Sequence, residues 1–303
     1  MSAELEAAAD EVCASCGKAA VDDTKLKKCA CNLVKYCGVD CQTNHRPQHK
    51  KACKKRLAEL RDDRLFTQPD GNHLGECPIC FLPQPFDEKN RKMQPCCSKY
   101  ICKGCVYANV LREEEENLEP RCPFCREPVP NTDEEVNKMA EKRIEANDPE
   151  ELTEMGIRRC GEGRYTEAFK YWTKAAELKN VEAHYGLALL YAEGKGIERD
   201  LKKKIYHLEE AAIGGHYDAR YNLACVEGKN GRIDRAVKHW VIAAKLGSDN
   251  AMKSLRGGFA DGFVSKEDFE AALHGHQAAM DATKSSQREL ADRNITICAT
   301  IGR

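Results

Sequence analysis

Cysteine is concentrated in one part of this chain, because fifteen of its eighteen cysteines lie within the first 125 residues. Most come in pairs a few residues apart. Tetrahedral Zn²⁺ needs such soft pairs, since one pair supplies two corners of a site and a second pair closes it. With one histidine they form two ladders of eight ligand positions each, which predict four zinc sites. The first ladder is Cys13, Cys16, Cys29, Cys31, Cys37, Cys41, His49 and Cys53, and the second is Cys77, Cys80, Cys96, Cys97, Cys102, Cys105, Cys122 and Cys125.

A disulfide framework is the alternative, and it requires an oxidising compartment. The chain opens with the acidic stretch MSAELEAAADE, which lacks the apolar segment of a secretory signal, and no apolar run is long enough to span a membrane. We therefore expect an intracellular protein, cytoplasmic or nuclear, whose thiols stay reduced and bind metal. The glycosylation sequon at residues 294–296 is then an accident of composition.

The charge balance gives no reason to expect a nucleic acid partner. The formal net charge is −1 over 303 residues, and the estimated pI is 6.8. One dense basic run covers residues 49–56. It fits the solvated face of a helix that closes the first zinc module, and a nuclear-import signal or a phosphate contact is the alternative.

The first ladder resembles the MYND finger in its gaps and in the Tyr36-Cys37 neighbours. One departure is the single residue, Ala30, between the third and fourth ligands. His49 is favoured over His45 because it lies one helical turn before Cys53, on the same face. The resemblance implies two interleaved zinc sites, the first held by Cys13, Cys16, Cys37 and Cys41 and the second by Cys29, Cys31, His49 and Cys53.

With all corners filled by protein ligands, these zinc ions would be structural, because no position is left for an activated water. The segment has few large apolar residues, so metal binding should supply most of its folding free energy. The MYND resemblance implies a protein-interaction module, often for proline-containing peptides.

The second ladder, with CPIC at residues 77–80 and CPFC at residues 122–125, resembles a RING finger. The commonest RING pattern would place a ligand at Lys99, but a protonated lysine has no lone pair to give. The eighth ligand must then be the vicinal cysteine, which requires a tight turn. The resemblance implies a cross-brace with one zinc at Cys77, Cys80, Cys102 and Cys105 and the other at Cys96, Cys97, Cys122 and Cys125.

The RING resemblance also implies an activity, ubiquitin ligation, in which no residue of the chain forms a covalent intermediate. A RING holds the thioester of a ubiquitin-conjugating enzyme in a reactive pose, which is catalysis by orientation. The residues that would contact the conjugating enzyme are Ile79, Pro123 with Phe124, and Arg126. The aromatic residue often found between the sixth and seventh ligands is not evident, and Tyr107 and Leu111 are the best apolar substitutes.

The rest of the chain is predicted to form helices. Thr132 and Glu135 form a capping box, and Asp148 before Pro149 starts another helix. A small-residue pair then recurs at residues 175, 211 and 243, a period in the thirties that indicates an α-solenoid. Residues 183–219 resemble a Sel-one-like repeat, a relative of the tetratricopeptide unit.

Several residues in the repeats invite a ligand interpretation, but packing explains them better. Trp172 and Trp240 occupy the same repeat position, where helices must approach closely. The histidines of the repeats have no cysteine partners at ligand spacing, so solvated or core imidazoles are expected. These are His184, His216, His274 and His276; the isolated cysteines Cys160, Cys225 and Cys298 are expected to pack as small apolar residues.

The predicted fold class is thus small zinc-stabilised modules followed by an all-α helical-repeat solenoid. The leading functional hypothesis is a RING-type ubiquitin ligase that recruits protein substrates through its MYND finger and repeats. The alternative is a non-catalytic adaptor, and a weaker third is a transcriptional complex. The predicted segments are a MYND-type finger at 10–56, a RING-type finger at 74–130, a connector helix at 131–148, Sel-one-like repeats at 149–280 and a flexible tail at 281–303.

Overall fold

We analysed a computed structural model of the chain, in which residues 12–19 and 26–294 are described. The chain divides into two compact units, Met1–Thr67 and Gln68–Arg303. The boundary falls before the second cysteine ladder, so the predicted RING-type segment shares a unit with the repeats. Residues 10, 11 and 295–303, including Cys298, lie outside the described residues.

The first unit is built around its cysteines. Strands β1 (Lys27–Lys28) and β2 (Lys35–Tyr36) form an antiparallel pair, and helix α2 (Val39–Phe66) follows. The core cluster here consists of the buried side chains Cys13, Cys29, Cys31 and Tyr36, with Leu26 and Val34 packed against them. Such a core is too small to stabilise a fold by apolar burial alone, so metal must contribute.

The second unit begins with a small cysteine-rich module. A 3₁₀ turn, η1 (Glu88–Asn90), leads into the antiparallel hairpin of β3 (Arg91–Gln94) and β4 (Lys99–Cys102), and helix α3 (Lys103–Glu115) follows directly. The hairpin turn contains the vicinal cysteines. The amides of Cys97 and Ser98 both donate to the Gln94 carbonyl, at 3.2 and 2.8 Å, which is the tight turn that two adjacent ligands require.

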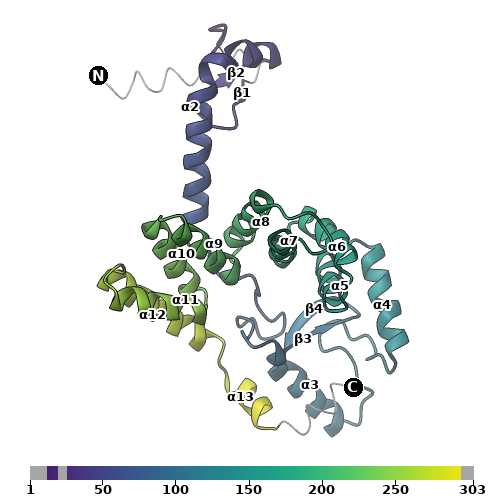
Figure 1. Ribbon diagram of the computed structural model, residues 1–303. Helices are drawn as coiled ribbons and strands as arrows, with labels where there is room; N and C mark the ends of the chain where they lie inside the picture. The colour runs from purple at the N-terminus through teal and green to yellow at the C-terminus, as the bar shows by residue number, and fades with distance from the viewer. Residues whose placement is uncertain (1–11, 20–25, 295–303) are drawn as a thin grey trace. The chain divides into compact units, whose positions relative to one another are not determined.

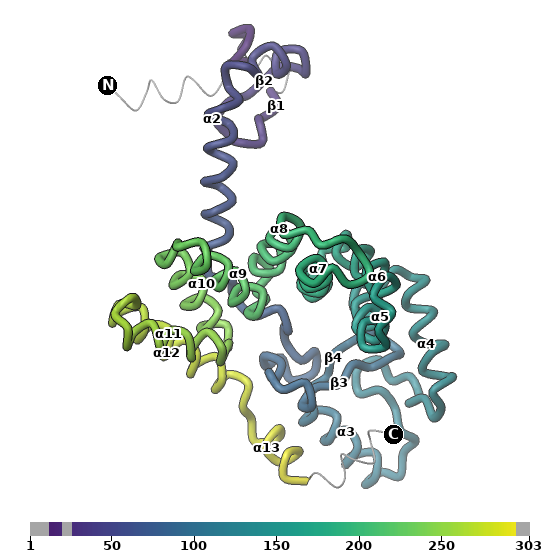
Figure 2. Tube along the Cα trace, viewed as in Figure 1, coloured from purple at the N-terminus to yellow at the C-terminus, as the bar shows by residue number. Residues whose placement is uncertain are grey.

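The repeats form the helical remainder of the second unit, and Figures 1 and 2 show these helices following one another in an arc, with β3, β4 and α3 drawn inside it. The connector α4 precedes pairs α5–α6, α7–α8, α9–α10 and α11–α12. Their bounds are α4 (Asp133–Glu145), α5 (Pro149–Gly161), α6 (Tyr165–Glu177), α7 (Val181–Glu193), α8 (Leu201–Ile213), α9 (Tyr217–Lys229), α10 (Ile233–Lys245), α11 (Asp249–Ala260) and α12 (Lys266–Ala282).

The helix starts predicted from the sequence are found. The Thr132 hydroxyl accepts from the Glu135 amide, and the Asp148 carboxylate accepts from the first two free amides of α5. A further helix start, that of α12, has the same kind of bond, in which the Ser265 hydroxyl accepts from the amide of Asp268 at 3.0 Å. Each bond satisfies an amide that the helix itself leaves unpaired.

Trp172 lies in the core, as the packing interpretation predicts. A methyl group added at Gly156 would lie 2.3 Å from its indole nitrogen, and one at Gly186 would lie 2.7 Å from its ring. The indole nitrogen donates to the Thr153 carbonyl at 3.2 Å. The two glycines therefore make room for one large ring, and Trp240 is partly buried against the core of α10 and α11.

The predicted tail differs from the structure, because helix α13 (Ser286–Arg293) forms within residues 281–303. Ser285 caps it by accepting from the Arg288 amide at 3.3 Å. It packs against α3, about 180 residues earlier in the chain. The periodicity of a short segment does not reveal contacts with residues so distant in the sequence. In the part of the chain that the structure describes, no helix has the length and apolar character needed to cross a membrane.

Candidate metal centres

The structure brings each of the four predicted ligand sets together. Within each set the candidate ligand atoms all lie within 4.8 Å of one another. Two thiolates bound to one tetrahedral zinc at about 2.3 Å lie about 3.8 Å apart. The closest sulfur pairs observed lie 3.3 to 3.9 Å apart, so the cysteine groups fit a zinc ion at their centre.

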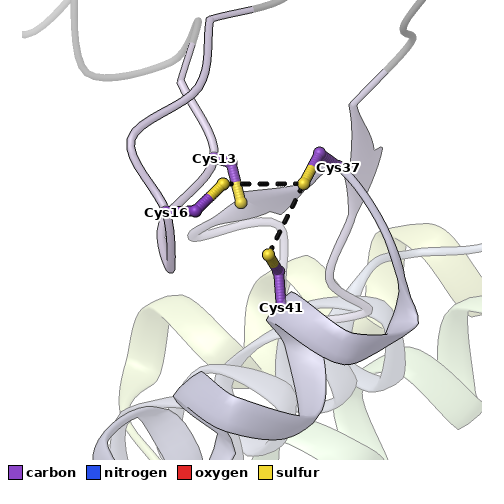
Figure 3. Close-up of side chains that lie close together, drawn as sticks. All are labelled: Cys13, Cys16, Cys37 and Cys41. Carbon is purple, nitrogen blue, oxygen red and sulfur yellow. Dashed lines mark hydrogen bonds between the residues drawn. The ribbon is translucent and has the colours of Figure 1, made fainter.

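The first site joins the start of the finger to the start of α2. Figure 3 shows the sulfurs of its four cysteines turned toward one another. The Cys37 sulfur lies 3.6 Å from that of Cys16 and 3.5 Å from that of Cys41. Hydrogen bonds from the backbone amides of Cys16 and Cys37 lower the pKa of Cys13 to about 6. A lowered pKa favours the thiolate, which is the form that binds metal.

In the second site the structure groups His49, and not His45, with the three cysteines. Nε2 of His49 lies 3.1 Å from the Cys31 sulfur, and the Cys29 and Cys53 sulfurs are 3.7 Å apart. The rival imidazole, His45, instead pairs through Nδ1 with the Tyr36 hydroxyl at 3.0 Å. The short loop around Ala30 still closes, because the Asn32 amide donates to the Cys29 carbonyl at 2.8 Å and Asn32 takes a φ of 59°.

The third site connects the loop after residue 76 with the β4–α3 junction. Its Cys80 and Cys102 sulfurs are 3.8 Å apart. A hydrogen bond from the Cys102 thiol, helped by backbone amides, lowers the pKa of Cys77 to about 4. The loop folds back as the Phe81 amide donates to the Cys77 carbonyl at 2.8 Å, with Phe81 at a φ of 57°.

The fourth site uses both vicinal cysteines. The Cys97 and Cys122 sulfurs lie 3.9 Å apart, and the Cys125 and Cys96 sulfurs 3.3 Å apart. Lys99 is the first residue of β4 and its side chain is exposed. The two sites of this module therefore interleave along the chain, since the first and third pairs meet at one site and the second and fourth pairs at the other.

These four groups suit structural zinc, which is the expected cofactor of the chain. Each group offers four protein ligand atoms within 4.8 Å of one another, which is the number that a tetrahedral zinc ion needs. A site closed in this way leaves no position for an activated water. The metal would hold the loops in place rather than act on a substrate.

A fifth group, which the sequence does not reveal, joins His73, Glu182 and His216. Oε2 of Glu182 lies 3.2 Å from Nε2 of both histidines, whose parallel rings stack with centroids 3.9 Å apart. The Nδ1 atom of His216 accepts from the Ala219 amide at 3.3 Å, which puts the imidazole proton on Nε2. That nitrogen is then a donor facing the carboxylate. We therefore interpret His73, Glu182 and His216 as a group of polar contacts that connects the cysteine-rich module to the repeats, and we call this group the polar clamp.

The residues predicted to meet a conjugating enzyme lie at the surface of the second cysteine-rich module. Ile79 is 36% exposed and Phe124 is 44% exposed. Phe81, which the sequence interpretation did not single out, is 70% exposed. Arg126 is exposed as well, and its guanidinium donates to Asn109 of α3 at 3.1 Å.

Two protein families match parts of this chain. Residues 13–53 match the MYND finger, and residues 159–180, 181–216 and 218–248 match the Sel1 repeat. The chain therefore carries a MYND zinc finger followed by Sel1 repeats, both of which are protein–protein interaction modules. This confirms the resemblances drawn for the first ladder and for the helical repeats.

Individual relatives match shorter stretches. The chain is 41% identical over 56 residues, 18% of its length, to a putative beta-lactamase HcpC of Helicobacter pylori. It is 35% identical over 88 residues, 28% of its length, to the E3 ubiquitin-protein ligase DA2 of Arabidopsis thaliana. The matches cover 19% and 20% of those relatives, so the chain spans about a fifth of the length of the curated relatives that it matches.

Among solved structures, a Sel1 repeat protein from Oxalobacter formigenes is similar, with 23% identity, a TM-score of 0.43, and coverage of 59% of this chain and 72% of that one. A protective antigen of uropathogenic Escherichia coli with an SLR fold has 25% identity and a TM-score of 0.39, and covers 48% of this chain and 33% of its own.

Proposed function

We propose that this protein is a RING-type ubiquitin ligase in the reducing interior of the cell. In this proposal the second cysteine-rich module docks a ubiquitin-conjugating enzyme, and the MYND finger and Sel1 repeats recruit protein substrates. The observation that carries the proposal is the interleaving of the two metal groups at residues 77–105 and 96–125. That interleaving agrees with the cross-brace that the RING resemblance implies, and so supports the proposal.

An exposed apolar surface supports docking at this module. Ile79 and Phe81 lie on the loop of the third metal site, and Phe124 lies on the loop of the fourth. Where such side chains adjoin one another, the exposed apolar area that they form is typical of an interaction site. Pro123, beside Phe124, is half-buried and would shape the same surface.

Arg126 supports the second part of the mechanism, which is to hold ubiquitin in place. Its backbone has a φ of 66°, and its carbonyl accepts from Arg121 at 3.2 Å. The contact with Asn109 fixes its guanidinium beside α3. A cation held in this way can bond the charged conjugating enzyme and its ubiquitin together, so that the thioester stays in a reactive pose.

No residue of this chain needs to form a covalent intermediate in such a mechanism. The lysine amine of the substrate attacks the thioester on the conjugating enzyme, an isopeptide bond forms, and the thiol of the conjugating enzyme leaves. The chain contributes orientation alone. The similarity to an E3 ubiquitin-protein ligase of Arabidopsis thaliana agrees with this class of activity.

One observation favours the alternative, a non-catalytic adaptor. Tyr107, the best aromatic substitute on α3, is only 8% exposed and packs inward. It is therefore not available to a conjugating enzyme in the way that an exposed aromatic would be. Under the adaptor hypothesis, the cysteine-rich modules and the repeats bind proteins and catalyse no reaction.

One experiment separates the two readings. Zinc-loaded full-length protein is mixed with a broad panel of ubiquitin-charged conjugating enzymes, and discharge of each thioester to free lysine is timed. The ligase proposal requires faster discharge from at least one enzyme, whereas no stimulation across the panel supports the adaptor.

A further inference from the structure

Arg288 of α13 reaches the third metal site from the far end of the chain. It is 7% exposed, although it is an arginine on a helix of eight residues. Its Nη1 donates to the carbonyls of Pro83 at 2.7 Å and of Thr283 at 2.6 Å. Its Nη2 donates to the Leu82 carbonyl at 3.4 Å and to the Cys80 sulfur at 3.5 Å.

The rest of α13 is seated closely enough to hold that guanidinium in place. A methyl group at Gly104 of α3 would lie 3.0 Å from the Cγ atom of Arg288 and 3.1 Å from its Cα atom. Gln287 donates to the Gly104 carbonyl at 3.1 Å. Lys103 and Asp292 form an ion pair at 3.1 Å. The helix thus approaches α3 at its one residue without a side chain.

The negative charge of the third metal site explains why an arginine contacts it. Four thiolates around one Zn²⁺ carry a net charge of −2, and burial makes that charge costly unless donors or cations face the sulfurs. A guanidinium is permanently charged and presents several N–H groups in a fixed plane. One such group faces the Cys80 sulfur, and others donate to the Leu82 and Pro83 carbonyls of the loop that follows it.

We propose that Arg288 is an outer-sphere positioning residue of the zinc site at Cys77, Cys80, Cys102 and Cys105. Through it, the carboxyl-terminal helix α13 is a structural part of the second cysteine-rich module. The same contacts hold residues 80–83, the segment that follows Ile79. This role concerns metal retention and does not depend on whether the module transfers ubiquitin.

The consequence is a direct link between the end of the chain and one metal site out of four. Partners that hydrogen-bond to metal ligands typically contribute about 10- to 100-fold to metal affinity. Loss of the Arg288 guanidinium should weaken the third site by that factor. The two sites of the first unit and the site at residues 96–125 should keep their affinities.

The test uses zinc-loaded full-length protein carrying Arg288→Met, which keeps a long side chain but removes the donors and the charge. Arg293→Met is the matched control, because that side chain lies on the same helix and is 76% exposed. A chelator is titrated in, released zinc is read with an indicator dye, and the cysteines that become alkylated are identified by mass spectrometry.

We expect Arg288→Met to lose one zinc of four at a chelator concentration about 10- to 100-fold lower than the wild type. Alkylation should then appear first at the third-site cysteines, such as Cys80, and Arg293→Met should match the wild type. Unchanged zinc retention and alkylation in Arg288→Met would overturn the proposal. Equal weakening of all four sites would overturn it too, because that pattern means general destabilisation.

A second variant guards against failure to fold. Arg288→Lys keeps the charge but offers one ammonium in place of a planar fork, so it should fold and still release the same single zinc early. Helical circular dichroism checks each variant. If Arg288→Lys folds and all its sites retain zinc as in the wild type, the guanidinium has no outer-sphere role.

Discussion

The hydroxyl of Tyr100 in β4 donates a 2.9 Å hydrogen bond to the Glu154 carboxylate in α5. Burial raises the pKa of Tyr100, and the Glu154 charge raises it further, so the phenol stays protonated as a donor. On the same side of the module, Nε of Arg143 in α4 donates to the Ser98 hydroxyl at 3.1 Å. The second cysteine-rich module is therefore fastened to the first helices of the repeats.

Metal content is the first prediction. We expect four zinc ions per chain, because each of the four groups supplies the four ligand atoms that a tetrahedral zinc needs. Elemental analysis of protein purified without added metal measures this number. Two or fewer at full occupancy would contradict the ligand assignment. A value near three would point to the tight loop at residues 29–31 or to the vicinal pair at residues 96–97.

Chelation is the second prediction. A strong chelator should unfold the first unit and the cysteine-rich module while most of the helical circular dichroism remains. The repeat cores, such as the one around Leu152 and Leu187, are apolar and contain no metal ligand. The melting temperature of the repeats should still fall, since bonds such as that of Tyr100 to Glu154 contribute about 1 kcal/mol each.

Limited proteolysis locates the change. New cleavage should fall in residues 12–67 and 76–128 after chelation, and residues 149–280 should stay protected. Wholesale loss of helix on chelation would show instead that the repeats cannot fold without the metal-bound module.

Acid sensitivity is the third prediction. Burial, followed by the nearby charge of His73, lowers the pKa of His216 to about 4, below the usual 6.5. Between pH 6.5 and 4, His216 is therefore protonated in the unfolded chain but not in the folded chain. The free energy of unfolding falls as the pH drops through this window. Burial acts to raise the pKa of Glu182, but His216 and His73 beside its carboxylate lower it by more, which makes acid destabilising in the same direction.

The measurement compares melting temperatures at pH 7.5 and pH 5.5. Zinc–thiolate sites also weaken in acid, so the informative quantity is the difference between the wild type and His216→Asn, which keeps a side chain able to cap α9. The wild type should lose roughly 5 °C more than His216→Asn. His274→Asn, at an exposed position of α12, is the control and should behave as the wild type. Equal acid losses in all three would contradict the clamp.

Core packing is the fourth prediction. Gly156→Ala should destabilise the second unit by about 1–3 kcal/mol, because the added methyl group would displace the Trp172 ring and strain its bond to Thr153. Gly161→Ala, on the same helix with no atom within 4 Å of the added methyl group, should change stability by no more than about 0.5 kcal/mol. Urea unfolding, followed by tryptophan fluorescence, measures both. If the two substitutions lowered the free energy of unfolding by similar amounts, the explanation based on the Trp172 ring would be wrong.

Local features of this protein were predictable from the sequence, and distant contacts were not. The spacing from His49 to Cys53 places both on one face of α2, and a short turn was required at Cys97, so both could be predicted. The caps at Thr132 and Asp148 follow from residues within one turn. By contrast, Arg288 meets the Cys80 loop across about 200 residues.

The polar clamp could not be predicted from the sequence for a related reason. His73 follows the end of the first unit, whereas Glu182 lies in the first turn of α7 and His216 at the N-cap of α9, with α8 between these two helices. Three segments must fold before these side chains meet, and none of them has a ligand partner at short spacing. Only the solenoid curvature brings them together, and periodicity fixes the number of repeats but not their curvature.

Transfer activity is the last prediction. Ile79→Ala should weaken docking of the conjugating enzyme, because it removes an exposed apolar contact without touching a metal ligand. Truncation of such an anchor typically costs about 1–2 kcal/mol, a roughly tenfold loss in a weak complex. Leu201→Ala, which removes a 52% exposed leucine of α8 in the repeats, is the matched control and should leave discharge unchanged.

Arg126→Ala should fail differently from Ile79→Ala. Docking should stay nearly intact, while discharge of the thioester slows, because the charge that holds ubiquitin in the reactive pose is gone. Binding of the uncharged conjugating enzyme and discharge to free lysine are measured in parallel, with zinc content checked in every variant. An active wild type whose discharge neither variant impairs would leave the ligase proposal standing but refute these two residues as its contacts. If both variants lose binding and discharge equally, Arg126 belongs to the docking surface and not to the step that orients ubiquitin.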